Sequence, residues 1–143
     1  MADNELCAGL DSEAIRRLES AAKPRRFEAR ATIIRAGESG ESVYLLVYGG
    51  VSVTVDVEGG RSARVATLSA GMTFGEMALL GENLRSANVS ADSDVECWQL
   101  TVDDLATLGE SDPGLRATVY ENLARKLAGN LRCANAQVQA LSG

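Results

Sequence analysis

The stretch FGEMALLGENLRSANV, residues 74–89, decides how the chain is interpreted. Gly75 is followed by a run of good helix formers, residues 76–80, between segments with strand-like patterns. Because glycine lacks a Cβ, a ligand can approach its backbone closely. A helical turn after it would present unpaired N–H groups, which attract anions. With Arg85 farther along the same stretch, the pattern predicts an anion site with one arginine as counter-charge.

The residue types around this turn indicate which anion would fit. Arg85 can bind a phosphate through two parallel hydrogen bonds, and Ser86 adds a hydroxyl donor. Glu76 only accepts hydrogen bonds at neutral pH, so it would repel an anion unless it binds neutral hydroxyls nearby. The set suits one phosphate with a sugar attached. Taken singly, Gly75 also fits an ordinary turn, and Glu76 with Arg85 a surface ion pair.

The surrounding residues have the period of β-strands. Valines alternate with polar residues over 51–57, which predicts a half-buried strand. Gly59-Gly60 predicts a hairpin that leads to a returning strand at 63–68. Further strand patterns lie at 42–48, 87–91 and 95–101. Many short strands separated by glycine turns favour a β-sandwich, a jelly roll or a barrel.

Helical patterns flank the strands on both sides. Residues 10–22 predict a helix with Asp11 as its N-cap. Thr101 and Asp104 form a capping-box pattern for a short helix through Leu108.

A long helix is predicted to begin at Asp112-Pro113. Its apolar stripe consists of Leu115, Val119, Leu123, Leu127 and Leu131, continued by Ala134, Val138 and Leu141. At ~1.5 Å per residue this helix would be roughly 40 Å long, more than one small barrel can cover. Part of the stripe is therefore expected to meet a partner copy, another domain or a ligand.

Composition excludes several classes of function. The 143 residues suit one domain, and the net charge of −6 argues against a nucleic-acid partner. The chain has no histidine, which removes most zinc sites and histidine-based catalysis, so no catalytic residue, metal or cofactor is expected. Cys7, Cys97 and Cys133 are predicted to be reduced thiols of a cytoplasmic protein. No apolar run is long enough for a direct membrane span, and residues 1–9 do not resemble a signal peptide.

Residues 74–89 resemble the phosphate-binding cassette of cyclic nucleotide-binding domains. The family pattern is roughly F-G-E-apolar-A-L, a short link, and R-[S/T/A]-A-x-V, and it is matched here by FGEMAL and RSANV. AGESGESVYLLVYGGVSV, residues 36–53, also resembles the glycine-punctuated hairpin of the family. The resemblance extends from about Leu10 to about Arg132. Leu84 and Asn88 depart from the pattern, where the family often has proline and threonine.

The resemblance implies a mainly β fold with flanking helices. This is an antiparallel double-stranded β-helix, a jelly-roll-like β-roll, with an N-terminal helix and two C-terminal helices. The chain is then a single domain over 1–143. Its expected parts are an N-terminal helical segment (1–23), a β-roll that carries the cassette (24–101) and C-terminal helices for a lid or dimerisation (102–143).

The resemblance also implies roles for individual residues. Arg85 would bind the exocyclic oxygens of a cyclic phosphate, and Glu76 would accept a hydrogen bond from the ribose 2′-hydroxyl. The expected ligand-binding residues are Phe74, Gly75, Glu76, Met77, Ala78, Arg85, Ser86 and Ala87. The candidates for a lid over the base are Leu127, Leu131 and Arg132.

The implied function is a non-catalytic regulatory domain that binds a 3′,5′-cyclic nucleotide and transmits binding through its last helix. Ser86 stands where many cAMP binders carry serine or alanine, which favours cAMP over cGMP. The alternatives are a cGMP-preferring binder and a ligand-independent dimerisation module of the same fold. An enzyme of the cupin type is disfavoured because its metal ligands are histidines. The output domain or partner is not identified by the sequence, and a homodimer through the last helix is a candidate.

Overall fold

Two four-stranded antiparallel sheets form the body of the molecule in a computed structural model that describes residues 1–142. One sheet has the strand order β1-β8-β3-β6 and the other β2-β7-β4-β5. The strands are β1 (Lys23–Phe27), β2 (Thr32–Ile34), β3 (Ser42–Tyr48), β4 (Val51–Val57), β5 (Arg61–Leu68), β6 (Thr73–Phe74), β7 (Asn88–Ala91) and β8 (Val95–Thr101). The helical elements are η1 (Glu5–Cys7), α1 (Ser12–Ala21), η2 (Glu76–Leu80), α2 (Val102–Ser111) and α3 (Pro113–Ser142). The prediction of a mainly β roll with an N-terminal helix and two C-terminal helices is confirmed.

The predicted helix caps are present. Asp11 accepts from the backbone N–H of Ala14 at 2.8 Å and begins α1. Thr101 and Asp104 form both hydrogen bonds of the capping box, and α2 continues three residues past the predicted end at Leu108. The Asp112 carboxylate accepts from the backbone N–H of Leu115 at the start of α3.

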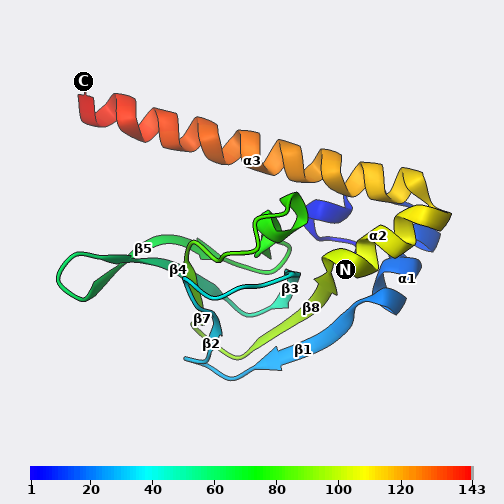
Figure 1. The fold of residues 1–143 in the computed structure, drawn as a ribbon, viewed down its shortest axis with the longest axis horizontal. Helices are drawn as coiled ribbons and strands as arrows, with labels where there is room; N and C mark the ends of the chain where they lie inside the picture. Colours follow the sequence, from blue (N-terminus) through cyan, green and yellow to red (C-terminus); the bar gives the residue numbers. More distant parts are fainter. Residues whose placement is uncertain (143) are drawn as a thin grey trace.

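The β4–β5 hairpin turns at Gly59-Gly60 as predicted, with Val57 paired with Arg61. Both glycines have positive φ, which favours glycine. The predicted alternation of buried and exposed residues on β4 is wrong, however. Burial declines from Val51 at the base to Val57 near the tip, because the hairpin extends beyond the body of the roll (Figure 1).

The apolar side chains form two clusters. One lies inside the roll, where Tyr44 and Phe74 stack with their ring centroids 5.0 Å apart. The other lies between η1, α1, α2, the first half of α3 and one sheet, and includes Leu18, Val43 and Leu123. The second cluster fixes α3 against the roll.

The helix α3 extends far beyond the core that it covers. Leu115, Val119 and Leu123 are buried, whereas Leu131 and Leu141 are exposed. Figure 1 shows α3 along one side of the roll, with its C-terminal half over the end that carries β4 and β5. Within residues 1–142, none of the helices combines the length and the apolar character that crossing a membrane requires.

Candidate functional site

The predicted turn at residues 76–80 is the short 3₁₀ helix η2, and Gly75 is its N-cap. Gly75 has φ 76° and ψ 13°, the left-handed region that favours glycine. A Cβ at this position would lie 3.0 Å from Arg85 Nη1 and 3.0 Å from the Ser42 carbonyl oxygen. The first N–H groups of the turn, those of Glu76 and Met77, precede the first intrahelical hydrogen bond. The turn therefore presents backbone donors beside an arginine, as the sequence predicts.

Two backbone carbonyls hold the Arg85 side chain. Its Nη1 donates to the Gly75 carbonyl at 3.1 Å, and its Nη2 donates to the Ser42 carbonyl at 2.8 Å. Its backbone N–H donates to Glu38, in the loop before β3. That loop also lacks a side chain at Gly40, where a Cβ would lie 2.2 Å from Arg85 Nε. The guanidinium is thus fixed between the cassette and the loop before β3.

The charge of Arg85 lies in a partly desolvated place. Burial lowers the pKa of its guanidinium, while the neighbouring Tyr44 and Glu76 raise it. An arginine stays protonated at neutral pH despite such a shift. Burial disfavours the charged form of Tyr44 as well. It raises the pKa of this tyrosine, so its hydroxyl stays neutral. Arg85 therefore keeps its positive charge in an environment that strengthens its attraction for an anion.

A cavity of about 450 Å³ opens beside this arginine. That volume is typical of sites for small organic ligands. The predicted ligand-binding residues that line it are Phe74, Gly75, Glu76, Met77, Arg85, Ser86 and Ala87. Apolar side chains from the strands complete its wall, among them Ile34, Val53, Leu68 and Val89. The structure thus brings the predicted set to one cavity, with the exception of Ala78, whose side chain is buried in the protein.

The predicted lid residues do not line the cavity. Leu127 packs against the helical core cluster, and Leu131 and Arg132 are exposed. The part of α3 that faces the cavity is a polar stripe of Lys126, Asn130, Cys133 and Gln137, and Ala134 at the border of this stripe also lines the cavity. In this structure the stripe faces the cavity and the three predicted lid residues do not, because the leucines that suggested a lid continue the core face of α3.

Glu76 is already paired in this structure. Its Oε1 lies 3.3 Å from Lys126 Nζ, and its side chain is only 14% exposed. Among the ion pairs of residues 1–142, Glu76 thus pairs with a lysine of α3 and not with Arg85. The pair connects the cassette to the helix that covers the cavity.

The sequence analysis missed Lys126 and the polar stripe that follows it. A signal was present, since residues 126, 130, 133 and 137 recur at helical spacing next to the leucines. Glu5 was also missed, although its Oε1 lies 2.7 Å from Lys126 Nζ. No local pattern could have found Glu5, because it reaches the site from the other end of the chain.

Known proteins resemble most of this chain, and two of them resemble nearly its whole length. The family profile "Cyclic nucleotide-binding domain" matches residues 24–112. Glutaminase 2 of Bradyrhizobium diazoefficiens is 37% identical over 99% of this chain, which spans 22% of that protein. The crystal structure of the Thermus thermophilus catabolite activator protein matches with a TM-score of 0.84 and 33% identity, over 97% of this chain and 63% of that one. The regulatory domain of Toxoplasma gondii PKA, solved with cAMP, has a TM-score of 0.67 and 27% identity, over 74% of this chain and 40% of that one.

The chain belongs to the cyclic nucleotide-binding domain family. It spans about a fifth of the length of the glutaminase and less than two thirds of the activator protein.

Proposed function

We propose that the cavity binds a 3′,5′-cyclic nucleotide, with cAMP as the preferred ligand, and that the domain is regulatory and not catalytic. The observation that carries this proposal is the convergence of one fixed guanidinium, one left-handed glycine and one partly buried carboxylate at the same cavity wall. These groups match a phosphate, its close approach to the backbone, and a sugar hydroxyl. The match to the domain solved with cAMP supports the same ligand class.

In this proposal Arg85 binds the exocyclic phosphate oxygens. Two of its five N–H groups donate to carbonyls, so the others remain for the ligand. Backbone N–H groups at the start of η2 and the Ser86 hydroxyl share the phosphate. Glu76 accepts from the ribose 2′-hydroxyl.

The base would lie between the apolar strand wall and the polar stripe of α3. Asn130 and Gln137 supply amide groups there, which can donate and accept hydrogen bonds. An occupied cavity would favour the position of α3 seen here, because the helix forms one side of it. Binding would then be transmitted along α3 to an attached domain or a second copy.

Calorimetric titration with cAMP and cGMP tests the proposal. We expect cAMP to bind more tightly than cGMP, and Arg85→Leu to weaken cAMP binding by roughly 2–4 kcal/mol through loss of a charged contact. Arg26→Leu removes an exposed arginine on β1 and serves as the matched control, which should bind like the wild type. Failure of both nucleotides to bind at millimolar concentration would refute the proposal. Tighter binding of cGMP would refute only the preference.

A further inference from the structure

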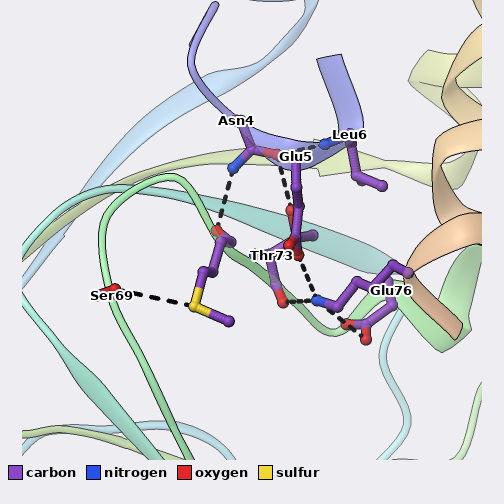
Figure 2. A network of polar contacts seen from close by, with 8 residues as sticks. Asn4, Glu5, Leu6, Ser69, Thr73 and Glu76 are labelled. Atoms are coloured by element: carbon purple, nitrogen blue, oxygen red, sulfur yellow. Dashed lines mark hydrogen bonds and ion pairs between the residues drawn. The ribbon is translucent and has the colours of Figure 1, made fainter. Parts of the chain in front are cut away.

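Lys126 is held by groups from three separate segments. Its Nζ lies 2.7 Å from Glu5 Oε1 in η1 and 3.3 Å from Glu76 Oε1 in η2. It also donates to the Thr73 carbonyl of β6. Figure 2 shows Glu5, Thr73 and Glu76 converging on this point. The lysine side chain is 10% exposed, so its ammonium group lies away from bulk water, with one hydrogen bond to a carbonyl and two ion pairs to carboxylates.

The Glu5 carboxylate is itself fixed in place. Its Oε1 accepts from the backbone N–H of Thr73 at 3.0 Å, and its own backbone N–H donates to the Gly71 carbonyl. The preceding Asn4 is buried and bonds both to the Thr73 hydroxyl and to the Met72 carbonyl (Figure 2). The N-terminal turn is thus anchored to the strand that leads into the cassette. Glu5 cannot leave Lys126 without breaking this anchor.

Two carboxylates share one ammonium in this cluster. The contact of Lys126 Nζ with Glu5 is the shorter, at 2.7 Å against 3.3 Å for Glu76. A carboxylate bound weakly by a lysine keeps its capacity to accept from a ligand hydroxyl. A carboxylate bound closely by the same lysine would offer that hydroxyl a weaker acceptor.

We infer that Glu5 is a positioning residue for the nucleotide site: it holds Lys126 back from Glu76 and so keeps the Glu76 carboxylate available to the ribose 2′-hydroxyl. This inference rests on the proposed function. It assigns a part in ligand binding to a residue of the N-terminal turn that does not line the cavity.

The experiment compares cAMP with 2′-deoxy-cAMP, which lacks only the hydroxyl in question. The quantity measured is the ratio of the two dissociation constants. The wild type should bind cAMP roughly tenfold or more tightly than the deoxy analogue, as expected for a hydrogen bond to a charged group. Glu5→Gln keeps an acceptor for the Thr73 N–H but removes the charge that competes for Lys126. We expect it to lower the ratio at least threefold.

Glu121→Gln is the matched control, because Glu121 is an exposed glutamate of α3 paired with Arg125. It removes the same charge and should leave the ratio unchanged. A role in folding alone would weaken both nucleotides equally, which the ratio does not register. If Glu5→Gln does not fold by circular dichroism, Glu5→Asp shortens the side chain by one methylene and is expected to lower the ratio as well.

The Lys126→Gln background tests whether Glu5 acts through the lysine. In that background Glu5→Gln should no longer change the ratio. An unchanged ratio in the Glu5 variant, or a change that persists without Lys126, would overturn the inference while the proposed function stands. A wild type that binds neither nucleotide would overturn both.

Discussion

Arg85 occupies space that Gly40 leaves open. A Cβ on Gly40 would lie 2.2 Å from Arg85 Nε, so Gly40→Ala must displace the guanidinium. Gly40 has no positive φ, and the obstructed group is the end of a flexible side chain. We therefore expect cAMP affinity to fall by roughly 1–2 kcal/mol with little loss of stability, measured by calorimetry and thermal unfolding.

Gly50→Ala is the matched control for this substitution. Its Cβ would meet the Leu68 carbonyl at an ordinary 3.5 Å, away from Arg85. It should leave affinity unchanged. Wild-type affinity in Gly40→Ala would mean that the position of Arg85 does not control binding.

The buried thiol of Cys97 makes stability depend on pH in alkaline solution. Burial raises its pKa from 9.0 to about 11, against a smaller lowering by Arg25. Between these values the unfolded chain releases a proton that the folded protein retains. The free energy of unfolding therefore falls as pH rises from 9 to 11, by about 2 kcal/mol for this thiol.

Urea unfolding of the wild type and of Cys97→Ala, at pH 8 and at pH 10.5, measures this contribution. The variant should lose less stability between the two pH values. An identical loss in both proteins would show that Cys97 does not titrate in this range.

At the scale of the elements, local signals predicted most of the fold. Capping residues such as Asp11 and Thr101 accept hydrogen bonds from residues three positions later, so the sequence predicts them directly. The short strands β1 and β2 were not predicted individually. Lys23–Phe27 is rich in charge, and its strand is formed by pairing with β8, about seventy residues later. Such pairing leaves no periodic pattern in the strand itself.

The contrast between local and long-range contacts also explains which residues of the site could be predicted from the sequence. The cassette is contiguous, so Gly75, Glu76 and Arg85 could be read from one motif. The contribution of α3 depends on how the helix is rotated against the roll. That rotation is fixed by contacts such as the Tyr120 hydroxyl to the Leu79 carbonyl and the Asn122 amide to the Leu6 carbonyl. These contacts join residues far apart in the chain and lie outside any motif.

At the scale of the whole molecule, the last turns of α3 carry an exposed apolar seam. The seam consists of Leu131, Ala134, Val138 and Leu141, spaced by three, four and three residues, and it continues the spacing of Leu127, which packs against the helical core cluster. Leu131 is 62% and Leu141 89% exposed. A 3.5-residue period with leucines is typical of a two-stranded coiled coil. We predict that two copies pair along this seam and that Leu131→Asp makes the protein monomeric in sedimentation experiments.

Ala136→Asp adds the same charge on the opposite side of α3 and should leave the dimer intact. The polar stripe that faces the cavity lies about a quarter turn from the seam. Pairing and ligand binding would therefore use adjacent faces of one helix. A wild type that is monomeric at high concentration, or a dimer that survives Leu131→Asp, would contradict the prediction.

The structure of the protein crystallised with cAMP tests the central claim most directly. The account predicts phosphate oxygens within hydrogen-bonding distance of the Arg85 guanidinium and of the backbone N–H groups of η2. It places the ribose 2′-hydroxyl at Glu76 and the base against the stripe of α3 that begins at Lys126. An empty cavity at saturating cAMP, or a nucleotide whose phosphate lies away from Arg85, would contradict it.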